Sequence, residues 1–344
     1  MAEQLVLERA FRWLDGERLI AFGRGLLADA GELIGEDGYT LLTTARAADS
    51  APWLAARAGV VHDVPDGRVD ELAAALRDQI EGELIVALGG GRVIDTAKAL
   101  AAADAPRRVA AIPTTLSGAE MTNVHMHAVG VPGDTPRVRP AIVINDPALC
   151  ASQPPAALAQ SAANALGHAA EGPLTPLQST VTTLAALEAA QLIGQAFGPN
   201  VTLDEYGVDD EPIRDKLALA ALLAGYVLGS TWYGLHHVMA QTLRRCAGLG
   251  HAEANAIMLP HTLAALARRN PAFSMRLAAS LGEEPTGFAA RLSALGGATT
   301  LREAGFDEQA LDACVEHAAA RPELAMTPPA ADREELRSLY EMAL

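Results

Sequence analysis

Cysteine and positive charge are both scarce in this chain of 344 residues. Three cysteines without a CxxC pair argue against a disulfide framework, which a chain of this length does not need. Lys and Arg number 26 against 42 Asp and Glu, which gives a formal net charge of −16. This balance argues against a nucleic-acid partner, because phosphate backbones are bound by concentrated positive charge. It leaves room for a local basic pocket that binds a small anion.

Long uncharged hydrophobic runs are also rare. Residues 217–243 contain no Asp, Glu, Lys or Arg and are long enough to span a bilayer. They also contain glycines, two histidines and a glutamine, which are costly or weakly favourable in lipid, so we expect a buried core helix. The N-terminal segment MAEQLVLERAFRW is charged and lacks a long apolar run, so we expect no signal peptide. A cytoplasmic protein without a membrane partner is the resulting expectation.

The first 150 residues alternate short apolar runs with helical stretches. Helical periodicity is visible at 68–79 and 92–103. Five runs predict strands, at 18–22, 39–44, 84–88, 109–112 and 141–144. Continuous apolar strands that alternate with helices indicate an α/β region with a parallel sheet covered on both faces.

The composition changes near residue 150, where long Ala- and Leu-rich stretches replace the strand-like runs. These stretches predict helices at 156–171, 180–197, 213–243 and 253–269. Two prolines at 154 and 155 suit the end of one element and the first turn of the next helix. We therefore predict an α/β domain at 1–152 and an all-helical domain at 153–344, with a ligand site between them.

The strongest local signal is the segment LIVALGGGRVIDTAKAL at 84–100. A buried strand ends in Gly89, Gly90 and Gly91 and continues directly into a helix. Glycines let the backbone approach a ligand closely, and the positive end of a helix favours phosphate. The pattern is neither a GxGxxG fingerprint nor a P-loop, and a plain turn is the other interpretation. A second strand precedes IPTTLSGAE (112–120), which offers three hydroxyls at a carboxyl end, where α/β sheets bind ligands.

The histidines form a second signal. His168 follows Asn164 by four residues and Gln241 follows His237 by four, so each pair shares one face of a predicted helix. His251 follows on the next predicted helix. Lone helical histidines are usually structural, but several near uncharged faces predict the wall of a site. Three imidazoles can bind Zn²⁺ or Fe²⁺, and neutral imidazoles can equally donate hydrogen bonds to an oxyanion without a metal.

Together these segments resemble the iron-containing alcohol dehydrogenase superfamily, and within it the maleylacetate reductases. The matching pieces occur in family order over about the first three quarters of the chain. They are GGGRVIDTAK (89–98), IPTTLSGAEMT (112–122), Pro140 with Asn145-Asp146-Pro147, NALGHAAEG (164–172) and GLHHVMAQTL…GLGHAEANAIMLPH (234–261). The resemblance implies a nucleotide-binding α/β domain followed by a helical domain, in the dehydroquinate synthase-like fold. It also implies catalysis in the cleft between the domains, and a homodimer.

The resemblance implies NADH or NADPH as the cofactor. Gly89, Gly90 and Gly91 would then hold the pyrophosphate, and Arg92 stands where the family usually has serine. The rest of the cofactor site would comprise Asp95, Lys98, Thr114, Thr115 and Ser117. Thr43 and Thr44 would lie near the adenosine ribose, and Arg46 could accept a 2′-phosphate.

The resemblance also defines a metal position. Metal-using members have one Asp and three His ligands, which correspond here to Asn164, His168, His237 and His251. Asn164 removes a negative charge from the shell of a divalent cation, which should weaken metal binding, so we expect a metal-free site. If a metal is bound, the three histidines are its expected ligands. A further histidine that is usual in the family corresponds to Gln241, and its loss removes a candidate proton donor.

Two enzyme functions remain open. The first is an NAD(P)H-dependent reductase of a small anionic keto or enone acid, similar to maleylacetate. The three histidines, with Asn164 and Gln241 beside them, would stabilise enolate charge after hydride transfer. The second is a non-redox biosynthetic enzyme, such as a lyase, cyclase or isomerase, on the same scaffold. It is motivated by the departures at Asn164, Gln241, Arg92 and Ala119. A catalytically silent binding protein is a third, weaker hypothesis.

Overall fold

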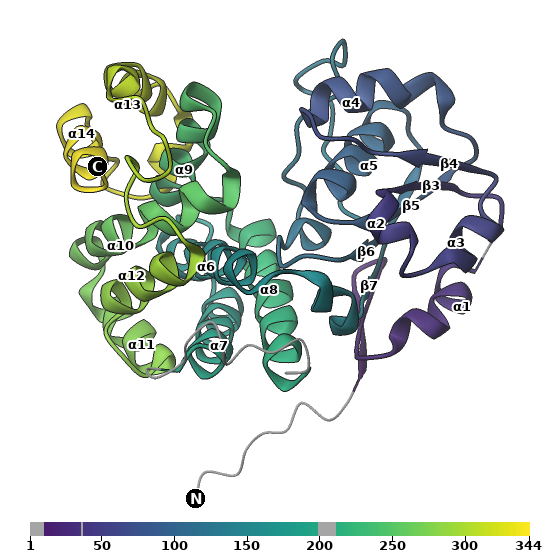
Figure 1. Cartoon of the computed structure of the whole chain (residues 1–344), viewed down its shortest axis with the longest axis horizontal. Helices are drawn as coiled ribbons and strands as arrows, with labels where there is room; N and C mark the ends of the chain where they lie inside the picture. The colour runs from purple at the N-terminus through teal and green to yellow at the C-terminus, as the bar shows by residue number, and fades with distance from the viewer. Residues whose placement is uncertain (1–9, 36, 199–210) are drawn as a thin grey trace, which may run out of the picture. The chain divides into compact units, whose positions relative to one another are not determined.

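The computed structural model describes residues 10–35, 37–198 and 211–344. Contacts divide the chain into two compact units (Figure 1). The first unit contains the chain up to Ser152 together with Arg214–Leu222, and the second contains Gln153–Ile213 and Leu223–Leu344.

A seven-stranded sheet forms the centre of the first unit, in the order β1-β2-β7-β6-β5-β3-β4. Every described strand pair is parallel except β1 with β2, so the expected parallel sheet carries one additional antiparallel strand at this edge. The reason is local, because a two-residue turn with Gly16 at positive φ joins β1 to β2 as a hairpin. The strands are β1 (Phe11–Asp15), β2 (Arg18–Phe22), β3 (Thr40–Thr43), β4 (Val60–Asp63), β5 (Leu84–Gly89), β6 (Arg108–Pro113) and β7 (Ile142–Asn145).

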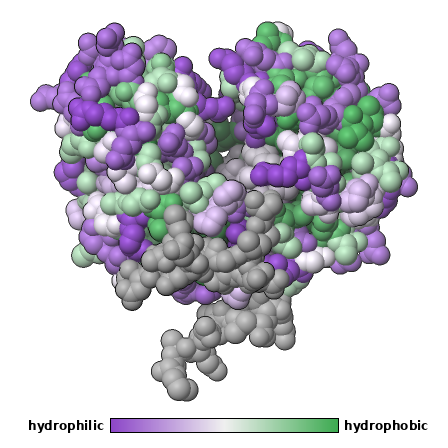
Figure 2. Space-filling view, viewed as in Figure 1, coloured by the Kyte–Doolittle hydropathy of each residue, from purple (hydrophilic) through white to green (hydrophobic). Residues whose placement is uncertain are grey.

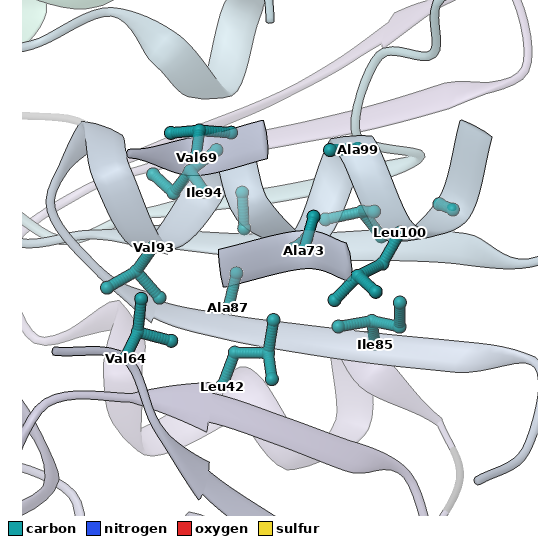
Figure 3. Close-up of a cluster of buried hydrophobic side chains, with 14 of the residues drawn as sticks. Leu42, Val64, Val69, Ala73, Ile85, Ala87, Val93, Ile94, Ala99 and Leu100 are labelled. Carbon is teal, nitrogen blue, oxygen red and sulfur yellow. The ribbon is translucent and has the colours of Figure 1, made fainter. Parts of the chain in front are cut away.

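Alternate residues of the central strands enter two separate cores. Leu42, Ile85 and Ala87 face α4 (Val69–Leu76) and α5 (Gly91–Ala103), as Figure 3 shows. Their neighbours in sequence, including Leu41 and Val86, belong to the core under the short helices of the opposite face. Those helices are α1 (Ala30–Ile34), α2 (Ala45–Ala48) and α3 (Pro52–Arg57). The apolar runs are continuous because both faces of these strands are covered.

Beyond Gln153, the part of the chain that the structure describes contains nine α-helices and no strand. Within the second unit, α10 packs against α6, α9 and α12. The helices are α6 (Pro155–Glu171), α7 (Thr180–Ala196), α8 (Glu211–Thr231), α9 (Leu235–Ala247), α10 (His251–Arg269), α11 (Pro271–Leu281), α12 (Pro285–Gly296), α13 (Leu311–Ala319) and α14 (Arg333–Met342). The face drawn in Figure 2 is mostly hydrophilic, in agreement with the acidic composition.

The sequence predicts one helix for the uncharged stretch at 217–243, but the structure contains parts of two helices there. The first helix ends at Thr231 and the second begins at Leu235, and the two helix axes differ by 98°. Trp232 has a φ of 62°, a conformation that bulky residues rarely adopt, and Gly234 precedes the new helix. Among the described residues, no single helix has both the length and the apolar character needed to cross a membrane, and only the bent pair α8 and α9 meets that test together.

Candidate active site

The glycine segment forms the start of α5. β5 ends at Gly89, Gly90 occupies the N-cap position, and the helix begins at Gly91. No side chain caps this 13-residue helix, so the first-turn N–H groups are open to an external acceptor. The positive end of the helix dipole therefore lies at the carboxyl end of the parallel strands, where a phosphate would be stabilised.

The two sequence segments predicted to bind a nucleotide lie against each other. A Cβ atom on Gly90 would stand 3.1 Å from Thr115 Oγ1, and one on Gly91 would stand 3.1 Å from Ser117 Oγ. This proximity follows from the sheet, because β5 and β6 are adjacent and parallel and end side by side. The glycines thus allow a close approach between backbone and hydroxyl-bearing side chains that larger residues would disturb. Thr114 is buried at the same position, at the end of β6.

The residues expected near the ribose follow the next strand of the sheet. Thr43 ends β3, which pairs with β5, and Thr44 caps α2 by accepting a hydrogen bond from Ala47 N at 3.3 Å. Arg46 is exposed one residue into α2. Arg92, in the first turn of α5, pairs with the exposed Asp66 at 2.6 Å. A cation therefore stands beside the glycine turn, although it already has a carboxylate partner.

Lys98 is fully buried and has a structural role in the first unit. Its ammonium donates hydrogen bonds to the backbone oxygens of Ala119, Thr122 and Val124 at 2.9–3.2 Å. Asp95 Oδ1 lies 2.8 Å from the same nitrogen. Lys98 thus fixes the segment that follows Ser117, while Asp95 is the more exposed member of the pair.

The second unit brings His168 and His237 into direct contact. Their rings are stacked with centroids 3.9 Å apart and planes 6° apart, and both side chains are buried. His168 comes from α6 and His237 from the first turn of α9. The close approach requires Gly167, because a Cβ there would stand 2.5 Å from the ring of His236. The glycine in NALGHAAEG therefore lets two helices meet where the histidines lie.

Side chains from distant parts of the chain hold the N-terminus of α9. Leu235 N donates to Thr327 Oγ1 at 2.9 Å, and His236 N donates to Glu171 Oε2 at 3.1 Å. The other carboxylate oxygen of Glu171 is hydrogen-bonded to His237 Nδ1. Glu171 thus contacts both the backbone of α9 and the ring of its histidine, and it is 1% exposed.

Burial sets the protonation of the cluster. It lowers the pKa of His168 and of His237 well below the usual value. It lowers the pKa of His236 to about 3. It raises the pKa of Glu171 to about 7. The imidazoles are therefore neutral at pH 7, able to bind a metal or to hydrogen-bond a substrate oxygen.

Asn164, Gln241 and His251 have different surroundings. Asn164 Nδ2 lies 3.2 Å from His168 Nε2, so this pair is joined as its spacing predicts. Gln241 Oε1 accepts a hydrogen bond from Arg321 Nη2 at 3.1 Å. His251 is the exposed first residue of α10. A proton on His251 would nevertheless lower the pKa of both stacked histidines, so this side chain lies within electrostatic reach of them.

Glu171 and Arg321 contact this cluster, and the sequence analysis singled out neither. Arg321 also donates to Tyr233 Oη at 2.9 Å and pairs with Glu323. Glu171 carried a usable signal, because it follows His168 by three residues and so lies on the same helix face. Arg321 lies 80 residues from Gln241 in a segment without a motif, and no local pattern predicts that contact.

The comparisons with known proteins agree with these features. Residues 18–147 match the family model "Iron-containing alcohol dehydrogenase", and residues 158–344 match "Fe-containing alcohol dehydrogenase family, C-terminal". The chain belongs to the iron-containing alcohol dehydrogenase family, and it is an NAD(P)-dependent oxidoreductase.

Within that family the chain is most like the maleylacetate reductases. It is 40% identical to maleylacetate reductase 2 of Cupriavidus pinatubonensis over 69% of this chain and 66% of that protein. It is 32% identical to the maleylacetate reductase of Rhizobium sp. over 94% and 95%. The crystal structure of the Agrobacterium tumefaciens enzyme matches with a TM-score of 0.82 at 26% identity, covering 98% of this chain and 99% of that one.

The family name raises the question of whether these residues fit a divalent metal. Within the described residues, His168 Nδ1, His237 Nε2 and Asn164 Oδ1 are buried and have no hydrogen-bond partner. His168, His237 and Glu171 also place one possible ligand atom each within 4.8 Å of one another. The unpaired atoms therefore fit a cation in the chemistry of their donors. Glu171, however, is engaged with His237 Nδ1 and the backbone of α9. A neutral amide thus stands where metal-using relatives are expected to have a carboxylate.

Proposed function

We propose that this chain is an NAD(P)H-dependent reductase of a small unsaturated keto acid similar to maleylacetate. The observation that carries the proposal is the stacked pair of buried, neutral imidazoles, His168 and His237, each with an unpaired ring nitrogen. The maleylacetate reductases among its relatives support the substrate class. Hydride addition to a carbon conjugated with a carbonyl places negative charge on the carbonyl oxygen, and such charge needs hydrogen-bond donors.

In this proposal the first unit binds the nucleotide. The glycine turn, the open N–H groups of α5, Thr115 and Ser117 surround the pyrophosphate. Thr43 and Thr44 lie near the adenosine ribose, and Arg46 accepts the 2′-phosphate if NADPH is used. Bound NAD(P)H supplies the hydride from C4 of its nicotinamide ring.

The second unit orients the substrate. His168, His237 and His251 position the carbonyl oxygen and stabilise the enolate charge that develops on it. Gln241 does not supply a proton, since its side chain is an amide and its oxygen accepts from Arg321. The proton that completes the reduction comes from water or another protein acid.

The proposal does not depend on a metal. Neutral imidazoles can stabilise an oxyanion directly, and Asn164 adds no negative charge that would favour a cation. If iron binds, His168, His237 and His251 would hold it together with Asn164. It would then act as a Lewis acid on the substrate carbonyl.

Nicotinamide fluorescence tests the cofactor. NADH and NADPH are titrated in turn, and we expect enhanced fluorescence with at least one of them. No binding at millimolar cofactor would overturn the proposal. The non-redox alternative makes the opposite prediction, because its turnover would be unchanged after nicotinamide is stripped from the protein.

We also propose that the enzyme is cytoplasmic, as its sequence leads us to expect, and that it is a homodimer, as its family resemblance implies. Light scattering after size-exclusion chromatography should give twice the chain mass of 35.8 kDa, and a monomer would contradict the proposal.

A further inference from the structure

Glu171 is placed to do more than fill the core. Glu171 is the last residue of α6, and its side chain reaches the first turn of α9, where its two carboxylate oxygens have different partners. Oε2 accepts the backbone N–H of His236 at 3.1 Å, which stabilises the start of the helix. Oε1 is bound to Nδ1 of the His237 ring. One carboxylate therefore serves a structural and a ring-orienting contact at the same time.

The contact between Glu171 and the His237 ring determines which ring nitrogen is available to bind another group. Nδ1 is occupied by Glu171, whereas Nε2 is buried and has no hydrogen-bond partner within the described chain. Two neighbouring rings also restrain the His237 ring, because it stacks on His168 and meets His236 edge-on with the ring centroids 4.7 Å apart. A ring flip would bring a carbon to Glu171 and leave the buried carboxylate oxygen unpaired, which is unfavourable.

We propose that Glu171 is a positioning residue, which orients His237 so that Nε2 is the nitrogen presented to the substrate or to a metal. A carboxylate that is hydrogen-bonded to one ring nitrogen of a histidine fixes both the tautomer and the orientation of the ring, and so determines how the other nitrogen is presented. The catalytic consequence rests on the proposed reductase function, but the orientation of the ring does not.

The chain offers a matched control for the structural half of this role. Thr327 caps Leu235 N, the N–H next to the one that Glu171 accepts, and it is fully buried. It makes no hydrogen bond to the His237 ring. Thr327→Val therefore weakens the start of α9 without removing the ring contact, while Glu171→Leu removes both. Glu171→Gln keeps an oxygen for the ring and loses the charge.

The direct readout is the ¹⁵N NMR signal of the His237 ring in the full chain without substrate, assigned with His237→Asn. We expect one tautomer in the parent protein, in Thr327→Val and in Glu171→Gln, and a mixture of tautomers in Glu171→Leu. A single unchanged tautomer in Glu171→Leu would overturn the proposal, even if no reductase activity were found.

Kinetics supply the second readout. For Glu171→Leu we expect kcat to fall by about 10- to 100-fold, with the KM for NAD(P)H unchanged and with substantial rescue in Glu171→Gln. Thr327→Val should lower the melting temperature with little loss of kcat in the folded protein. Equal loss of kcat in Glu171→Leu and Thr327→Val would assign Glu171 a capping role only and contradict the proposal. Absence of reductase activity in the parent protein would instead refute the proposed function.

Discussion

The candidate nucleotide site and the histidine cluster are built in opposite ways. The candidate nucleotide site consists mainly of backbone N–H groups and of glycines without a Cβ atom, and its residues come from short segments after adjacent strands. The histidine cluster consists of side chains, and their hydrogen-bond partners come from α6, α9 and residues near the C-terminus. A backbone site can be read from local sequence, whereas a side-chain cluster depends on how helices pack.

The largest effect is expected when Nε2 of His237 is removed. In His237→Asn, the amide can still bond Glu171, but nothing replaces Nε2. We expect kcat to fall about a thousandfold, because the ring nitrogen that faces the reacting oxygen is lost. Steady-state kinetics give kcat, and the melting temperature controls for folding. Near-normal kcat would show that the cluster is structural.

The next prediction restores the charge that Asn164 lacks. Asn164→Asp should bind Fe²⁺ or Zn²⁺ at least about tenfold more tightly than the parent, since a carboxylate attracts the cation directly. Metal titration followed by elemental analysis measures the difference. Equal, tight binding by both proteins would show that the neutral set suffices and would refute the expected metal-free site.

A matched pair of glycine substitutions tests the backbone site. Gly91→Ala places a Cβ about 3.1 Å from Ser117 and should weaken NAD(P)H binding about tenfold, because overpacking costs ~1–3 kcal/mol. Gly133→Ala is the control, since a Cβ there meets no atom within 4 Å. Cofactor titration compares the two variants. Equal affinities would argue that the glycine turn is an ordinary connection.

The last prediction concerns stability and not activity, and it is made for the buried Glu120. Glu120, in the first unit, has no imidazole partner, and burial raises its pKa to about 7 from an ordinary 4.5. The folded protein therefore keeps a proton that the unfolded chain releases, and stability is lost as the pH rises from 4.5 to 7. Glu120→Gln should remove up to ~1.4 kcal/mol of this loss per pH unit. Unfolding at pH 5 and pH 7 measures it, and identical pH dependence in both proteins would contradict the assignment.

The contrast explains what the sequence could predict. Five strands of the first unit and the pairing of Asn164 with His168 follow from periodicity and spacing. The hairpin strand β1 was missed because its residues alternate in burial at the sheet edge and lack a continuous apolar run. The break at Trp232 was missed because a charge-free stretch carries no signal for a strained turn. The spacing places Glu171 on the helix face of His168, but its contact with His237 and the contact of Arg321 with Gln241 are tertiary and have no local signal.

The most direct test of the central claim is the absorbance of NAD(P)H in the presence of the enzyme and maleylacetate. We predict that the reduced cofactor is consumed in proportion to the unsaturated keto acid, and only when both are present. Conversion of maleylacetate without consumption of the cofactor, or no reaction with either NADH or NADPH, would contradict the account.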